Sequence, residues 1–121
     1  MRTIKFRGKR VDTNEWVYGS LIEDKYIVGN VIDWNEDYFN TEYWWKVIPE
    51  TVGQFTGLYD KNGKEIYEGD LVVYYASGFA RIEFVAGGFH IIQEEYGFDF
   101  MGQMLATIEV IGNIFDNKEL L

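Results

Sequence analysis

His90 is the only histidine of the chain, so it is the first residue to consider for catalysis. A Ser–His–Asp triad would need His90 beside Ser20 or Ser77, the two serines, and neither stands in the Gly-x-Ser-x-Gly pattern of an exposed nucleophile. The 121 residues include no cysteine, which excludes a thiol nucleophile and thiolate ligands for zinc. We therefore expect His90 to be a structural residue in a strand that follows Gly87-Gly88.

Carboxylates are the remaining ligands, and they suit hard cations such as Mg²⁺ and Ca²⁺. They gather in two short stretches, Asp33, Glu36 and Asp37 and then Glu94, Glu95 and Asp99. Neither stretch has the spaced ligands, the central glycine and the final glutamate of a calcium-binding loop. We expect solvated acidic loops and no cofactor, and a divalent-metal hydrolase is kept as the one enzymatic alternative.

Asp70 follows Gly69 at a predicted corner, where a lone aspartate could serve as a catalytic acid. The residue types favour a structural role, because glycine adopts unusual backbone angles and aspartate accepts hydrogen bonds from the N–H groups of a turn. The glycine-rich phosphate loops Gly-x-Gly-x-x-Gly and Gly-x(4)-Gly-Lys-Ser/Thr do not occur in the sequence. Nucleotide binding therefore has no support.

Charge is distributed unevenly along the chain. The formal net charge is −9, from 11 basic and 20 acidic residues, yet the first ten residues hold five basic residues and no acidic one. The acidic remainder should repel nucleic acid, although Lys5, Arg7, Lys9 and Arg10 could bind phosphates in a salt-dependent manner. We favour pairing of this strip with the protein's own carboxylates. In a variant of the nucleic-acid hypothesis, the acidic body mimics nucleic acid in the basic groove of a host protein.

Aromatic residues make up 18% of the chain, with four Trp, nine Tyr and nine Phe. Tyr and Trp are favoured at protein interfaces, and aromatic residues also form strands well or fill a small core. Trp44 and Trp45 are adjacent, and neighbouring side chains of a strand point to opposite faces. One of the two should therefore face outward or be covered by another lobe, which suits a β module that binds a protein partner or itself.

Short alternating runs between turn residues predict an all-β protein. Pro49 favours a short helical turn, Asn62-Gly63 favours a tight hairpin, and Asp116 followed by Glu119 favours a C-terminal helical turn. Residues 33–41 are predicted to form a loop with interleaved aromatics, and residues 94–105 give no clear assignment. The predicted strands cover residues 3–7, 16–22, 26–32, 43–48, 54–58, 71–75, 80–85, 89–92 and 107–111.

The length suits one domain over residues 1–121, which could comprise two small packed β lobes, 1–48 and 49–121, that share a core. The second lobe, from about Gln54, should resemble an SH3-like barrel. No apolar run approaches the roughly 20 residues that cross a bilayer, and no charged-then-apolar leader begins the chain. We expect a soluble protein with no membrane contact.

The run Pro49–Leu58, continued by Asp60–Val72, resembles the hallmark of the YopX family. Ile4–Lys9 and Trp16–Gly19 resemble the family's start, and Ile108–Phe115 resembles its end; the likeness is weakest over about 33–43 and 76–106. The resemblance implies a mostly-β fold, an origin in a bacteriophage or prophage, and a place in the cytoplasm of the bacterial host. The family is largely uncharacterised, so the resemblance carries over no catalytic residue.

The favoured hypothesis is a non-enzymatic accessory protein that binds another protein or forms a homo-oligomer. The alternatives are nucleic-acid association through the basic strip and metal-dependent hydrolysis at the acidic loops. The identity of the partner is not predicted. The candidate binding residues are Lys5, Arg7, Lys9, Arg10, Trp44 and Trp45.

Overall fold

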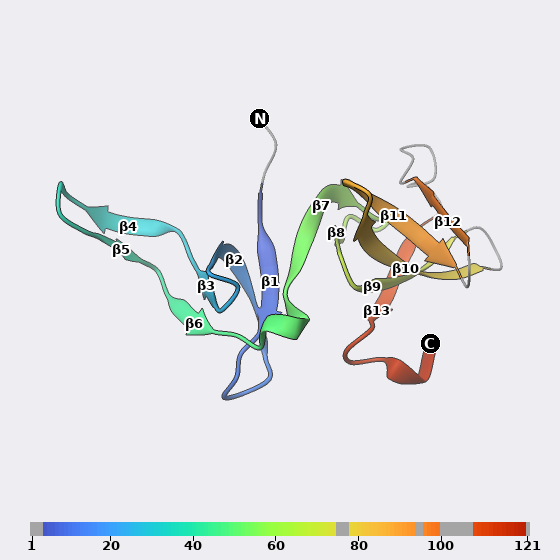
Figure 1. Cartoon of the computed structure of the whole chain (residues 1–121), viewed down its shortest axis with the longest axis horizontal. Helices are drawn as coiled ribbons and strands as arrows, with labels where there is room; N and C mark the ends of the chain where they lie inside the picture. Colours follow the sequence, from blue (N-terminus) through green and yellow to red (C-terminus); the bar gives the residue numbers. More distant parts are fainter. Residues whose placement is uncertain (1–3, 75–77, 94–95, 100–107, 121) are drawn as a thin grey trace. The chain divides into compact units, whose positions relative to one another are not determined.

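A computed structural model describes residues 4–74, 78–93, 96–99 and 108–120. Its elements are antiparallel β-strands and short 3₁₀ turns, so the prediction of an all-β fold is confirmed (Figure 1). The chain divides into two compact units, residues 1–54 and 55–121, and the predicted lobe boundary lies shortly before this division. In the described part of the chain, no helical segment has the length and hydrophobicity needed to span a bilayer.

The first unit is built on an antiparallel sheet in the order β6-β3-β2-β1, which continues into the start of β7. Ile27 and Val47 are fully buried in this unit. The 3₁₀ turn η1 (Pro49–Thr51) begins at a proline, whose fixed φ suits the first helical position. Thr51 Oγ1 accepts a hydrogen bond from Lys9 N at 2.9 Å, which ties η1 to the sheet. The strands are β1 (Phe6–Lys9), β2 (Trp16–Ile22), β3 (Tyr26–Val28), β6 (Trp44–Lys46) and β7 (Gly53–Tyr59).

A β-hairpin extends from β3 and β6 and ends in the two-stranded pair β4 (Val31–Trp34) and β5 (Phe39–Thr41). Backbone hydrogen bonds from Gly29 N to Tyr43 O and from Glu42 N to Asn30 O continue the ladder between the two strand pairs. The result is one ribbon from Tyr26 to Lys46. We call residues 31–41 of this ribbon the arm (Figure 1, cyan to teal).

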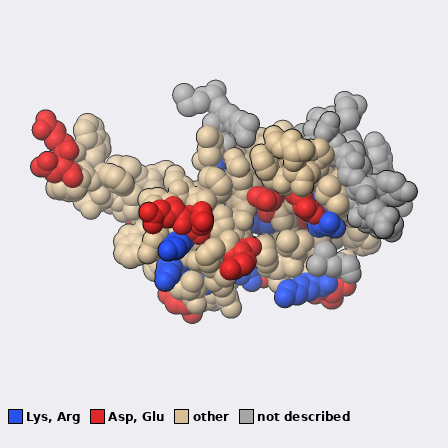
Figure 2. Space-filling model, viewed as in Figure 1, with Lys and Arg blue, Asp and Glu red and all other residues tan. Residues whose placement is uncertain are grey.

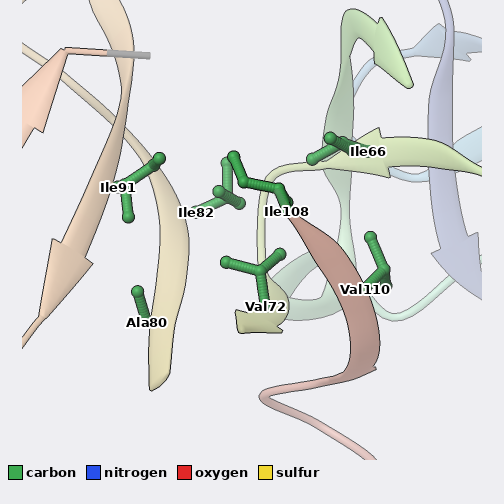
Figure 3. Packing of buried hydrophobic residues seen from close by; sticks show 7 residues of the cluster. All are labelled: Ile66, Val72, Ala80, Ile82, Ile91, Ile108 and Val110. Carbon is green, nitrogen blue, oxygen red and sulfur yellow. The ribbon is translucent and has the colours of Figure 1, made fainter. Parts of the chain in front are cut away.

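The second unit contains an antiparallel sheet in the order β12-β11-β10-β9-β13 and a β7–β8 ladder. Seven buried side chains converge between these strands and form its core (Figure 3): Ile66, Val72, Ala80, Ile82, Ile91, Ile108 and Val110. This cluster comes from positions far apart in the sequence, so it ties the unit together through non-local contacts. The remaining strands are β8 (Glu65–Tyr67), β9 (Asp70–Tyr74), β10 (Gly78–Val85), β11 (Gly88–Gln93), β12 (Tyr96–Asp99) and β13 (Glu109–Asn113).

The predicted hairpin at Asn62-Gly63 joins β7 to β8, and Gly63 has a φ of 83°, which glycine adopts without strain. Asp60 organises this turn, because Oδ1 accepts from Asn62 N at 2.8 Å and Lys64 N at 2.9 Å. Its other oxygen accepts from Val110 N at 2.9 Å, so the same carboxylate anchors β13. These three N–H bonds outweigh the opposing effect of burial, and the pKa of Asp60 lies below its usual value.

The corner at Gly69-Asp70 has the structural role predicted from the residue types. Gly69 has a φ of 92°, and its N–H donates to Ile82 O at 2.8 Å. Asp70 is almost completely buried, and its Oδ2 accepts from Tyr67 N at 2.7 Å. The carboxylate thus closes the turn between β8 and β9 rather than facing an open site.

Residues 33–41 were expected to form a loop, and this prediction was wrong, because β4 and β5 cover most of them. The strand expected over residues 26–32 is instead two strands, β3 and β4, with a break at Gly29 and Asn30. The C-terminal helical turn is present as η3 (Lys118–Leu120). The SH3-like description of the second half stays a prediction. Of the unassigned stretch 94–105, Tyr96–Asp99 is the described part, and the rest lies outside the described residues.

Candidate protein-binding surface

The register of the first unit places Arg7 and Lys9 on one face of its sheet. Arg7 pairs with Tyr18 and Lys9 with Trp16, and paired side chains of an antiparallel ladder lie on the same face. The Arg7 guanidinium lies 4.6 Å from the centroid of the Trp16 ring, and Lys9 Nζ lies 5.5 Å from it. Arg7 is only 6% exposed, so its side chain belongs to the packing of the protein.

Arg10 stacks on Trp45, with 3.5 Å between the guanidinium carbon and the ring centroid. The same guanidinium makes two hydrogen bonds to Asp12, from Nε to Oδ1 at 2.9 Å and from Nη2 to Oδ2 at 2.7 Å. These bonds lower the pKa of Asp12 below its usual value. Arg10 therefore pairs with a carboxylate of its own chain. Lys5 is half-buried just before β1. A role of these four cations in binding stays a prediction.

Trp44 is 64% exposed and lies beside Tyr26 in an edge-to-face arrangement, with 5.8 Å between ring centroids and 70° between planes. Its neighbour Trp45 is half-buried under Arg10, so the two indoles have different environments. Trp44 and Tyr26, together with Ile22 and Val28, line an open pocket of about 270 Å³. The pairs Ile22–Tyr26 and Val28–Trp44 set these four side chains on one face of β2, β3 and β6.

The arm exposes large apolar side chains along its whole length. Val31 is 53% exposed, Trp34 74% and Phe39 59%, and every residue from 30 to 40 is exposed. Trp34 pairs with Phe39, and Val31 pairs with Thr41. Because Phe39 and Thr41 share a face of β5, Val31 and Trp34 share that face as well.

A β-bulge makes this shared face possible. Val31 and Trp34 are three positions apart, so they would point to opposite sides of a regular strand. The register shifts between Val31 and Asp33, and Ile32 is the extra residue. Asp33 and Asn40 form a polar pair on the opposite face, which also carries the exposed Tyr38. The arm therefore has one apolar face and one mixed face, and its apolar face is open to solvent.

The tip of the arm is acidic. Asn35 closes the turn, because its Oδ1 accepts from Asp37 N at 2.7 Å and Tyr38 N at 3.2 Å. Glu36 and Asp37 lie in this turn and are exposed, and Figure 2 shows acidic atoms gathered at the end of the arm. The acidic stretch Asp33, Glu36 and Asp37 thus belongs to a projecting hairpin.

In the described part of the chain, the acids and the histidine do not gather into a metal site. No group of three or more His, Cys, Asp or Glu side chains there could hold a metal ion. His90 Nδ1 lies 3.1 Å from Gly88 O, within its own strand β11. Glu94 and Glu95 lie outside the described residues, as does the side chain of Asp99.

A family model described as YopX protein matches residues 5–121, which is nearly the whole chain. The chain belongs to the YopX family. The crystal structure of protein EF1440 from Enterococcus faecalis is similar, with a TM-score of 0.72 and 28% sequence identity. That match covers 100% of this chain and 99% of EF1440. No curated protein matches the sequence significantly. The YopX family and EF1440 support the fold, and neither description names a substrate or a partner.

Sequence reasoning missed the arm, although it singled out the aromatic residues of this stretch. The signal that could have found it is Asn35 followed by two acidic residues between two apolar runs, a pattern typical of a hairpin turn. Of the six predicted binding residues, Trp44 alone is a lining residue of the pocket. The residues that sequence reasoning did not select are Val31, Trp34 and Phe39 on the arm and Ile22, Tyr26 and Val28 in the pocket.

Proposed function

We propose that this member of the YopX family is a non-enzymatic protein-binding module and that the arm is its main binding element. The observation that carries the proposal is the apolar face of the arm, on which Val31, Trp34 and Phe39 are each more than half exposed. We further propose that it is a phage or prophage accessory protein of the host cytoplasm, on the strength of the family resemblance.

The energetics of the arm favour a bound state. A two-stranded hairpin without further support is marginally stable in water, because it buries little apolar surface. Fully burying one large apolar side chain stabilises by about 1.5–3 kcal/mol. A partner that covers Trp34 and Phe39 would therefore stabilise the arm and gain affinity from the same contacts. Aromatic side chains in such positions are the usual hot spots of protein interfaces.

The pocket beside Trp44 favours binding over catalysis. All four lining side chains are apolar or aromatic, and none is a carboxylate, histidine or lysine. Sites for small ligands usually enclose about 300–1,000 Å³ and contain a few well-placed polar groups. At about 270 Å³ and open to solvent, the pocket suits an inserted side chain better than a substrate.

Site-specific photocrosslinking in host cells tests this proposal. A photoreactive phenylalanine analogue would replace Phe39 in one protein and Phe79 in another. Position 79 is the matched control for position 39, because Phe79 is 58% exposed and Phe39 is 59% exposed. The two residues lie in different units. We expect position 39 to form a discrete crosslink to a protein, and position 79 to form none or far less.

A crosslink from position 39 to any protein, whether foreign or a second copy, supports the proposed function. Equal labelling from both positions, or no labelling from position 39, would contradict it. The crosslinked species would be identified by its mass, which separates a second copy from a foreign partner.

A further inference from the structure

We infer that the arm docks on a second copy of this chain, with its aromatic side chains seated in the open pocket of Ile22, Tyr26, Val28 and Trp44. The inference rests on the proposed function and specifies the partner. It pairs two exposed apolar features of the first unit, namely the projecting arm and the open pocket.

The chemistry of the pocket matches the arm. Its volume of about 270 Å³ is open to solvent, and its walls are apolar and aromatic. Trp44 and Tyr26 already lie edge to face, and a third ring entering the pocket could extend this arrangement. Trp34 and Phe39 are paired across the arm, so they are presented together.

The length of the ribbon suits docking between two copies of the chain. Tyr26, Val28 and Trp44 lie at its base, in β3 and β6, while Trp34 lies six residues beyond Val28. At roughly 3.3 Å per residue, the apolar tip stands about 20 Å from the base of its own ribbon. The arm of one copy can therefore reach the pocket of another, whereas it extends away from the pocket of its own ribbon.

The surface available suits a weak, transient interface. A fully buried aromatic side chain removes about 150–250 Å² from solvent. Trp34 and Phe39 are each more than half exposed on the apolar face of the arm, and Val31 adds to them. Docking would bury on the order of 300 Å² from this face. Ile22 and Trp44 are exposed in the pocket, and their area leaves each copy below the roughly 800 Å² of a standard interface.

Charge contributes little to the orientation of docking. Asp33, Glu36 and Asp37 make the end of the arm negative, and Lys46 stands beside Tyr26 in the register at the edge of the pocket. Lys25 lies next to Tyr26, in the same turn as Glu23 and Asp24, so the edge carries both signs. The apolar contacts must supply the affinity, since exposed ion pairs contribute little.

A mixing experiment with two variants tests the inference. The arm variant carries Trp34→Ala and Phe39→Ala, and the pocket variant carries Ile22→Glu and Trp44→Ala. Each variant retains the feature that the other lacks. Phe79→Ala is the matched control, and circular dichroism with thermal unfolding shows whether each protein is folded. The masses would be measured by sedimentation and native mass spectrometry for each protein alone and for equimolar mixtures.

We expect wild type and Phe79→Ala to self-associate at about 100 µM, and each variant alone to associate at least about 30-fold more weakly, the loss expected for one buried aromatic anchor. The mixture of the two variants should form a heterodimer, since one intact arm meets one intact pocket. Monomeric wild type, or folded variants whose mixture stays monomeric, would overturn the inference. If the inference failed in this way, a foreign protein crosslinked at position 39 would still support the proposed function.

Discussion

The arm and the core of the second unit use the same strand-forming residue types with opposite outcomes. In the core, seven apolar side chains from five segments face one another, and Ile66, Val72, Ile82, Ile91 and Ile108 are fully buried. In the arm, Val31, Trp34 and Phe39 share a face that meets water. Strand propensity explains both regions, whereas burial distinguishes them.

The difference separates residues that fold the protein from residues available for binding. A buried side chain contributes to stability through contacts that exist within one chain, and its removal leaves a cavity. An exposed aromatic contributes little to the stability of its own chain, so its removal should change association instead. Substitutions in the core should therefore lower the stability of the protein, whereas substitutions in the arm should weaken its association with a partner.

Truncation of the core should give the largest loss of stability. Ile82→Ala removes a fully buried side chain from the centre of the cluster (Figure 3), and we expect a loss of about 2–5 kcal/mol in the free energy of unfolding. Urea denaturation followed by circular dichroism measures it. A loss under about 1 kcal/mol would show that the cluster is not the stabilising core of the second unit.

Loss of the Asp60 carboxylate should have the next largest effect. Asp60→Ala leaves the N–H groups of Asn62, Lys64 and Val110 without this acceptor, and we expect a cost of about 2–3 kcal/mol. The same denaturation experiment measures it, and Lys61→Ala, in the same turn but exposed, is the control. Equal stability of the two variants would contradict the anchoring role of Asp60.

Asp60 should also contribute to acid sensitivity. Its pKa is lowered in the folded protein, so its stabilising contribution is complete above the unfolded pKa of about 4 and is lost as the pH falls through the lower folded pKa. Asp60→Asn should therefore show a shallower loss of stability below about pH 4 than wild type. Parallel pH profiles of the two proteins would contradict this assignment.

Loosening the base of the arm should have a smaller effect. Tyr43 Oη donates to Tyr18 O at 2.6 Å, which links the ribbon to β2. Tyr43→Phe removes this bond and keeps the ring, so we expect a loss of about 1 kcal/mol or less. Thermal unfolding measures the change, and a cost as large as that of Ile82→Ala would mean that the arm is part of the folding core.

Truncation of the arm itself should change stability least. For Trp34→Ala with Phe39→Ala we expect a change within about 0.5 kcal/mol for the dilute, unassociated protein, because both side chains are exposed. Denaturation of a dilute sample measures it. A loss above about 2 kcal/mol would place these rings in intramolecular packing and remove the contrast between the two regions.

The sequence was sufficient to predict the fold class and several elements with local signals. Trp16–Ile22 is rich in apolar and aromatic residues and forms β2, Pro49 begins η1, and Asn62-Gly63 lies in a hairpin. Residues 33–41 were predicted as a loop because polar and acidic residues separate their aromatics, and the bulge at Ile32 shifts the period of two within the arm. Local patterns cannot reveal such a shift, since it depends on the partner strand.

Pairing between distant residues was also beyond the sequence. The bond from Val110 N to Asp60 spans 50 positions, and nothing near either residue indicates it. The candidate site was predicted in part, because Trp44 lines the pocket while Arg7 is buried beside Trp16. The exposed fraction of a side chain depends on which residues pack against it, and amino-acid composition does not reveal those contacts.

Amide hydrogen exchange at several protein concentrations tests the central claim most directly, namely that a second copy covers the arm. The account predicts that residues 31–41 exchange rapidly in dilute protein and become protected as the concentration rises, while β9 and β10 stay protected throughout. Exchange in the arm that is the same at every concentration, with the core intact, would contradict it.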